Sequence, residues 1–262
     1  MNRKSRHSRA RIAQLLLLFV LAAPPSLAEQ ARTLVIIIDD LGNQLESGVR
    51  AATLPGKLNL AILPDTPNGQ ALAELAAALG KEVVLHQPMS NFHSKPLGPC
   101  ALTAQMGEQL LRSTLAECID RTPYIRGVSN HMGSQLTSMR EPMVWVMQEL
   151  SGRNLYYVVD SRTTSESVAA SVAAEYGIPH LSRQVFLDNE TSRTAIDARF
   201  RQVLAVADAE GIGIAVGHPY PETLSYLQEV LPTLQHQGYR LALISEVLAA
   251  PRQAYPGGEL AD

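Results

Sequence analysis

The chain has 262 residues, of which 18% are charged, and its 22 basic and 25 acidic residues give a formal net charge of −3. The first 28 residues contain five of the basic residues and no acidic one, so the rest of the chain carries 17 − 25 = −8. This acidic balance argues against a nucleic-acid-binding surface. The 262 − 28 = 234 residues that follow suit one large α/β domain or a single β/α barrel.

The N-terminal segment has the pattern of an export signal. Basic residues between Arg3 and Arg11 precede the short apolar run Ile12–Ala23, and small residues end the segment at Ala28. The run is too short to span a bilayer comfortably, so we expect a cleaved signal peptide over residues 1–28, with an uncleaved anchor as the alternative. The mature chain, residues 29–262, is then expected to be a single periplasmic domain with no stable membrane span.

Two adjacent carboxylates end an unusually apolar run. Leu34–Ile38 is followed by Asp39 and Asp40, and Gly42 comes soon after. Such a run predicts a strand covered on both faces, as in parallel sheets, which bind ligands at the carboxyl ends of their strands. The alternative is a solvated Asp that caps the next helix. Neighbouring strand residues point to opposite faces, so both carboxylates reach one site only if the backbone turns, which Gly42 favours.

Other apolar segments end in the same way. His86 ends the run EVVLH, and His131 follows Asn130 in VSNHMGS. Asp160 follows LYYVV, and His218 follows GIGIAVG. A single His at a strand end is more often a hydrogen-bonded structural residue than a ligand. Repetition at several strand ends favours a shared site, because the catalytic residues of β/α barrels come from the ends of several strands.

Strand and helix signals alternate along the chain, which predicts a parallel sheet in a barrel or in a long open sheet. Predicted strands cover Thr33–Asp39, Leu58–Leu63, Glu82–His86, Ile125–Asn130, Leu155–Val159, Gln184–Leu187, Gly213–Gly217 and Arg240–Ile244. Predicted helices are an alanine-rich one that Gly80 ends, Pro142–Leu150, Asp197–Ala209 and Glu222–Gln237, which Pro232 must interrupt.

Two cysteines, Cys100 and Cys118, are present. In the oxidising compartment that an export signal implies, they favour a disulfide, with two separate thiols on a helix and its leading loop as the alternative.

The motifs IDDLG, VVLHQPM, VSNHMGS, VVDSRTT and VGHPYPETL, in this order, resemble the divergent polysaccharide deacetylases, a branch related to carbohydrate esterase family four. The resemblance runs from Leu34 to Val247 and so covers nearly all of the mature chain. It implies an α/β fold with a distorted seven-stranded (β/α) barrel. It also implies metal-dependent removal of acetyl groups from N-acetylated sugars, which for an exported protein are glycans of the cell envelope.

The resemblance also assigns roles to the residues at the strand ends. Asp40, His86 and His131 match the metal ligands, and two imidazoles with one carboxylate suit Zn²⁺ or a similar divalent ion. Asp39 is expected to be the general base that takes a proton from water. His218 is expected to protonate the leaving nitrogen, with Asp160 orienting or tuning it.

Two motifs depart from the pattern of better-known family members. Ser90 stands four residues after His86, where those members have a metal ligand, and NHMGS replaces an Arg-rich motif. The third ligand is therefore expected to be His131 rather than His93, which lies in a polar, proline-bounded loop. Two alternatives follow. One is a deacetylase-like barrel that binds envelope glycan or a partner protein without turnover. The other is a metallohydrolase that acts on another amide, ester or phosphate bond.

Polar residues beside these motifs are candidates for substrate binding. Arg162 offers a cation that suits an anionic or carbonyl-bearing ligand, whereas Glu222 has the alternative of lying in the first turn of the helix after Pro221. Only 5% of residues are aromatic, which disfavours a long stacking groove and favours a short N-acetylated glycan or a peptidoglycan fragment. The predicted substrate-binding residues are Asn130, Ser134, Arg162, Tyr220 and Glu222.

Overall fold

A computed structural model describes residues 32–153 and 157–249. The predicted signal peptide, residues 1–28, lies outside these ranges, and so does Leu155 at the start of a predicted strand. Within the described ranges, no helix combines the length and the apolar character needed to cross a membrane.

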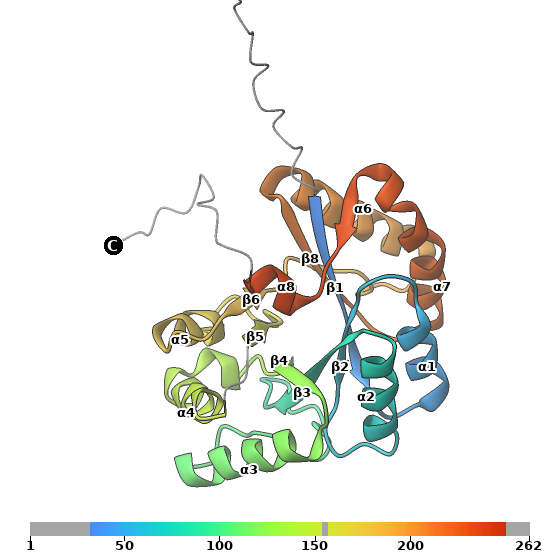
Figure 1. The fold of residues 1–262 in the computed structure, drawn as a ribbon. Helices are drawn as coiled ribbons and strands as arrows, with labels where there is room; N and C mark the ends of the chain where they lie inside the picture. The colour runs from blue at the N-terminus through green and yellow to red at the C-terminus, as the bar shows by residue number, and fades with distance from the viewer. Residues whose placement is uncertain (1–31, 154–156, 250–262) are drawn as a thin grey trace, which may run out of the picture. The chain divides into compact units, whose positions relative to one another are not determined.

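One curled sheet of parallel strands occupies the centre of the described part of the chain (Figure 1). Eight of its nine strands follow the order β6-β5-β4-β3-β2-β1-β8-β7, and the ninth, β9, lies off this path and pairs with β1. The strands are β1 (Arg32–Leu41), β2 (Asn59–Ile62), β3 (Glu82–Met89), β4 (Ile125–Met132), β5 (Tyr157–Asp160), β6 (His180–Ser182), β7 (Val185–Phe186), β8 (Ile212–Gly217) and β9 (Tyr239–Leu241). The α/β class and the distorted barrel are confirmed. Strands β6, β7 and β9 have only three, two and three residues, and they bring the number above the expected seven.

Helices connect the strands and surround the sheet (Figure 1). They are α1 (Leu45–Thr53), α2 (Gly69–Ala78), α3 (Glu108–Arg121), α4 (Arg140–Ser151), α5 (Ala169–Glu175), α6 (Arg193–Glu210), α7 (Pro221–Val230) and α8 (Ile244–Ala249). Helices α2, α4, α6 and α7 match the predicted ones. Helix α7 ends at Val230 and short 3-10 turns follow, as expected from Pro232, which has no N–H to continue an α-helix.

One predicted strand ends earlier than expected. The sequence predicts a strand from Arg240 to Ile244, but β9 ends at Leu241 and Ile244 begins α8. The backbone N–H of Ile244 donates to the Asn59 side chain at 2.9 Å instead of continuing the ladder with a neighbouring strand. A side-chain acceptor from β2 thus turns the chain out of the sheet.

The sheet is apolar on both faces, as the unbroken aliphatic run of β1 predicts. The even-numbered residues Leu34, Ile36 and Ile38 pack in a cluster with residues of α1, α2, α6 and α7. The odd-numbered Val35 and Ile37 belong to a second cluster on the inner, concave face. That inner cluster also contains Ala61, Val84, Tyr157, Val159, Ile214, Val216 and Ile244.

The two edges of the curled sheet are joined by the chain itself. Strands β6 and β7 are the ends of the path of paired strands, and two residues, Arg183 and Gln184, connect them. The N–H of Arg183 donates to the Asp160 carbonyl at 3.0 Å, on the β5 side. The N–H of Gln184 donates to the Ile214 carbonyl at 3.1 Å, on the β8 side. The chain therefore crosses from one edge to the other between these two residues.

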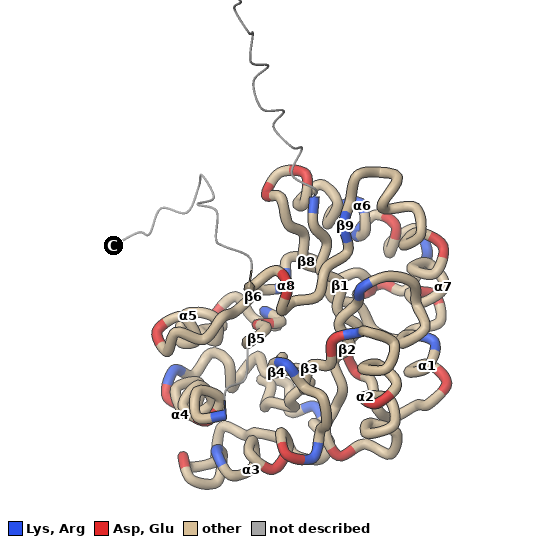
Figure 2. Tube along the Cα trace, in the orientation of Figure 1, with Lys and Arg blue, Asp and Glu red and all other residues tan. Residues whose placement is uncertain are grey.

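A disulfide joins Cys100 to Cys118, as the sequence favours. It connects the end of the loop after β3 to helix α3. Charges of both signs alternate along outer helices such as α3 and α4 (Figure 2), where Arg112 pairs with Glu108 and Arg153 with Glu149.

Candidate metal and acid–base centre

Four predicted site residues continue the inner face of the sheet at its carboxyl end. Asp39, His86 and His218 each lie two residues beyond an apolar residue of the inner cluster on the same strand. His131 lies two residues beyond Ser129, which is the partner of His86 across the β3–β4 pairing. Because side chains alternate along a strand, all four side chains point to the inner side of the same rim.

Asp40 joins this group through a break in the regular strand. The register between β1 and β2 shifts between Ile38 and Leu41, so β1 contains one extra residue there. Asp40 has φ +59°, in the left-handed region, and Gly42 follows with φ +122°. A bulge of this kind re-aims a side chain at the rim of a sheet. The turn that the paired carboxylates require is thus made at Asp40 itself, with Gly42 completing it.

Asp40, His86 and His131 bring three metal-binding atoms together, all within 4.8 Å of one another. The Asp40 Oδ1 atom lies 3.1 Å from His86 Nε2 and 2.7 Å from His131 Nδ1. On its other side, His86 Nδ1 hydrogen-bonds with Ser129 Oγ at 2.8 Å, which fixes the orientation of the ring. This is the only such cluster of His, Cys, Asp and Glu side chains among the described residues.

The three side chains fit a divalent metal. Asp40 Oδ1 is buried and, despite its two imidazole neighbours, has no partner with hydrogen-bond geometry. Burial alone would raise the pKa of Asp40, but the His131 and His86 nitrogens outweigh burial and hold that pKa well below its usual range. An ionised carboxylate with two converging imidazoles is a ligand set for Zn²⁺ or a similar ion.

Asp39 lies beside this cluster in a different environment. Its side chain is buried, its Oδ2 atom is 3.6 Å from His86 Nε2, and its Oδ1 atom has no hydrogen-bond partner. Burial raises the pKa of Asp39, and the nearby His86 and His218 offset only part of this shift. A carboxylate with a raised pKa and a free oxygen is suited to accept a proton.

His218 faces the same cluster from β8. Its Nε2 atom lies 3.9 Å from Asp40 Oδ2, while its Nδ1 atom is held 2.8 Å from Asp188 Oδ1. The other oxygen of Asp188 accepts hydrogen bonds from the His218 backbone N–H at 2.6 Å and from Thr223 Oγ1 at 2.8 Å. Burial would lower the pKa of His218, but the contact with Asp188 and the charges of Asp40 and Asp39 raise it to about 9.

Asp160 does not take the position that the sequence suggested. It was expected to orient His218, but Asp188 makes that contact. Asp160 follows the inner-face Val159 and so points the other way, where it accepts hydrogen bonds from Ser167 Oγ and from the backbone N–H of Arg162. Strand alternation is the physical reason for the difference.

A cation near the site comes from Arg183 rather than from Arg162. The Arg183 guanidinium donates to the Ser161 and Arg162 carbonyls at 2.6 and 2.8 Å and lies 3.7 Å from the centre of the Phe186 ring. Burial lowers the pKa of Arg183, and the charges of Asp160 and Asp39 partly restore it. Arg162 is exposed and has φ +45°, so its backbone shapes the loop after β5.

The predicted substrate-binding residues divide into structural and rim positions. Asn130 is buried and bonds to the Met132 carbonyl and the Ser161 N–H, so it supports the rim. Ser134 accepts a hydrogen bond from the Phe92 N–H in the loop after β3. Tyr220 is 43% exposed, and its ring centre lies 5.6 Å from that of His218. Glu222 is exposed in the first turn of α7, as its structural alternative predicts.

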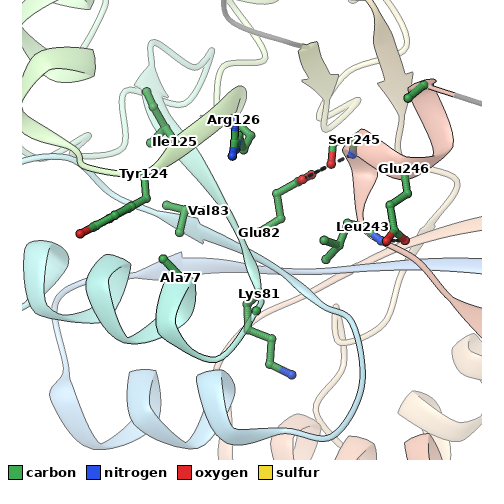
Figure 3. Close-up of a pocket in the computed structure, with 12 residues that line it drawn as sticks. Ala77, Lys81, Glu82, Val83, Tyr124, Ile125, Arg126, Leu243, Ser245 and Glu246 are labelled. Atoms are coloured by element: carbon green, nitrogen blue, oxygen red, sulfur yellow. Dashed lines mark hydrogen bonds between the residues drawn. The ribbon is translucent and has the colours of Figure 1, made fainter.

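Another cavity lies away from these residues. It has a volume of about 770 Å³ and lies where β3 and β4 begin, at the opposite end of these strands from His86 and His131 (Figure 3). Its buried carboxylate, Glu82, is fully paired with Tyr157 and Ser245. Lys81 donates to the carbonyls of Leu54 and Gly56. Lys81 and Glu82 are thus bonded within the protein, whereas Asp39 at the opposite rim keeps an oxygen without a hydrogen-bond partner.

Comparisons with known proteins bear on the family and the fold. The family model described as "divergent polysaccharide deacetylase" matches residues 36–248. The protein YibQ of Escherichia coli K12, itself uncharacterized, is 33% identical over 204 residues, which are 78% of this chain and 64% of YibQ. The chain thus matches less than two thirds of that relative. A solved structure, the uncharacterized protein ATU2773 from Agrobacterium tumefaciens C58, has a TM-score of 0.77 at 20% identity over 82% of this chain and 88% of its own.

A second solved structure shares the fold more distantly. It is the catalytic domain of a peptidoglycan N-acetylglucosamine deacetylase from Eubacterium rectale, with a TM-score of 0.50 and 11% identity over 81% of this chain and 88% of its own.

Proposed function

Because the chain belongs to the divergent polysaccharide deacetylase family, we propose that it is an exported, metal-dependent hydrolase that removes acetyl groups from N-acetylated glycans of the cell envelope. The observation that carries this proposal is the placement of a buried carboxylate, Asp39, and a carboxylate-held imidazole, His218, beside one metal-binding cluster. A binding protein without turnover has no need for an acid and a base around the same ligand atoms.

In amide hydrolysis at this site, side chains of the protein itself accept and donate the protons. Asp40, His86 and His131 would hold a divalent ion, which when bound would supply Lewis-acid chemistry for the carbonyl and the water. Asp39 accepts the proton of the attacking water on its unpaired Oδ1 atom. His218 gives the proton on its Nε2 atom to the departing nitrogen, while Asp188 holds its Nδ1 atom. The ring is thereby fixed with its proton-donating edge toward the cluster.

The family and the sequence support the proposed substrate class and compartment. The Eubacterium rectale protein is named as a peptidoglycan deacetylase, and a peptidoglycan fragment or short glycan suits a site with few aromatic residues. The export signal of residues 1–28 supports a periplasmic location. The set of two histidines and one carboxylate favours Zn²⁺.

Elemental analysis of the purified protein is the first test. We expect about one equivalent of zinc or a similar divalent ion in the wild type and its loss in the His86→Ala, His131→Ala double variant. Release of acetate from N-acetylated glycan fragments then tests the reaction. If the protein binds metal but hydrolyses another amide, ester or phosphate instead, the proposed metal centre would stand and the proposed substrate would be wrong. Absence of metal after incubation with several ions would overturn the mechanism in favour of a binding protein.

A further inference from the structure

The loop between β3 and the disulfide at Cys100 lines two cavities of different chemistry. Its first part, Asn91–Lys95, lines a cavity of about 390 Å³ together with Ser134, Thr163 and Thr164. Its second part, Pro96–Pro99, lines a separate cavity of about 300 Å³. Adjacent residues at the end of β4 divide in the same way, because Met132 lines the first cavity and His131 the second. The two cavities therefore lie on opposite sides of this loop and strand end.

The second cavity, which we call the proline cavity, is the one that reaches the candidate metal ligands. Asp40 and His131 are among its lining residues. Four of the others are prolines, which have no N–H to donate, and two are leucines, whereas Asn43 and Thr66 add polar side chains. The prolines are Pro64, Pro88, Pro96 and Pro99, and the leucines are Leu63 and Leu97. A sugar ring, whose several hydroxyl groups need both donors and acceptors, finds few of them on a wall that is mostly apolar. An aliphatic chain is well matched.

The first cavity has the complementary character. Its lining includes the hydroxyl, imidazole and ammonium groups of Ser134, His93 and Lys95, while the Asn91 amide is bonded within the loop and holds its shape. Phe92 is 60% exposed at its edge and presents a ring face on which a sugar can stack. These groups suit the polar glycan part of a substrate.

We propose that the proline cavity binds the acyl chain of the substrate and selects chains longer than acetyl, on the order of four to eight carbons. This inference rests on the hydrolase of the proposed function and changes the acyl group that it removes from acetyl to a longer chain. A methyl group is about the size of a water molecule, whose share of liquid volume is about 30 Å³. An acetyl methyl group would therefore fill only about a tenth of the cavity's roughly 300 Å³.

The reaction is ordinary hydrolysis and needs no further reactant. The amide C–N bond breaks, a C–O bond forms from water, and the products are a carboxylate with its acyl chain and a protonated amine on the sugar. The acyl carbonyl carbon lies at the metal-binding cluster during this step, so the chain beyond it extends into whichever cavity opens from the cluster. That cavity is lined by Asp40 and His131.

The test is a series of chitobiose derivatives N-acylated with acetyl, butyryl, hexanoyl or octanoyl groups. We expect kcat/KM to rise by up to about fourfold for each buried methylene. Leu97→Trp, which fills the proline cavity, should remove the preference of hexanoyl over acetyl. The matched control is Leu110→Trp on α3, where Leu110 is 55% exposed and lines neither cavity, and it should keep the preference.

Binding of hexanoate and acetate, measured by calorimetry on the metal-loaded protein, separates this inference from the proposed function. If no derivative is hydrolysed but hexanoate binds more tightly than acetate and loses this advantage in Leu97→Trp, the acyl site is supported and the hydrolase is not. If acetyl is the best substrate and hexanoate binds no more tightly than acetate, the acyl selection is overturned and the hydrolase stands.

Discussion

At the scale of single residues, the site depends on two neighbouring carboxylates whose pKa values shift in opposite directions. Burial raises the pKa of Asp39, whereas the contacts of Asp40 with His131 and His86 lower its pKa. Environments that push the pKa values of like groups apart assign them different roles. The bulge in β1 creates this difference, because it turns Asp40 toward the imidazoles and leaves Asp39 in the regular inner face.

Asp39→Asn keeps the shape of the side chain and removes its basicity. We expect hydrolysis to fall by about 10²- to 10⁴-fold, the usual contribution of a general base, with bound metal unchanged. Asp40→Asn is the matched comparison and should lose the metal as well. Steady-state rates and elemental analysis of both variants check this pair, and unchanged hydrolysis in Asp39→Asn would remove Asp39 from the mechanism.

The alkaline limb of the pH–rate profile should report His218. The proton donor must be protonated, so activity is expected to fall above a pH of about 9, the raised pKa of His218. The Asp188 carboxylate favours the protonated ring, and Asp188→Asn should therefore lower that pKa and move the limb to lower pH. Asp160→Asn is the control, since Asp160 bonds to Ser167 and Arg162 instead. An equal shift in both variants would contradict the assignment.

Most residues of the cluster were predicted from strand ends, but the residue that holds His218 was not. Asp188 was missed although it directly follows the predicted strand Gln184–Leu187, the same signal that identified His86 and His218. The sequence gives no strand order, and the partner of His218 is set by the pairing of β7 with β8. Alternation could have excluded Asp160, because it is one residue out of phase with the inner face of β5.

At the scale of elements, length and apolar character decided what could be predicted. The aliphatic runs of β1, β3 and β8 are buried on both faces and were placed within a few residues. Strand β6 was missed because three residues carry no periodic signal. The bulge at Asp40 was expected only as a turn, because the register between two strands depends on residues of both.

At the same scale, the disulfide restrains the loop after β3, which lines both the proline cavity and the polar cavity beside it. Closing the 18-residue separation between Cys100 and Cys118 is expected to stabilise the fold by about 3 kcal/mol through loss of chain entropy in the unfolded state. Urea unfolding of the Cys100→Ser, Cys118→Ser double variant should show this loss. A change below about 1 kcal/mol would indicate that the unfolded loop is already restricted.

At the scale of the whole molecule, curling of the sheet brings the ends of β1, β3, β4 and β8 to one rim, which no single segment of sequence specifies. Metal binding should therefore stabilise the fold across several strands at once. We expect a divalent ion at 100 times its Kd to add about 2.7 kcal/mol to the free energy of unfolding, and EDTA to reverse this. Thermal unfolding of wild type and of the His86→Ala, His131→Ala variant checks it, because the variant should show no response.

The strand order also predicts that the parts of the site form at different times during folding. Strands β1 to β4, which carry all three candidate metal ligands, pair in sequential order. Strand β8 reaches the other side of β1 only through contacts such as Ile38 with Gly217, 217 − 38 = 179 residues apart. Long loop closures of this kind form late. We expect the metal-binding half to form from early contacts and His218 to reach the site last. A chain that has already bound its metal would then still lack its proton donor. It would also expose the apolar edge of β1 until β8 docks.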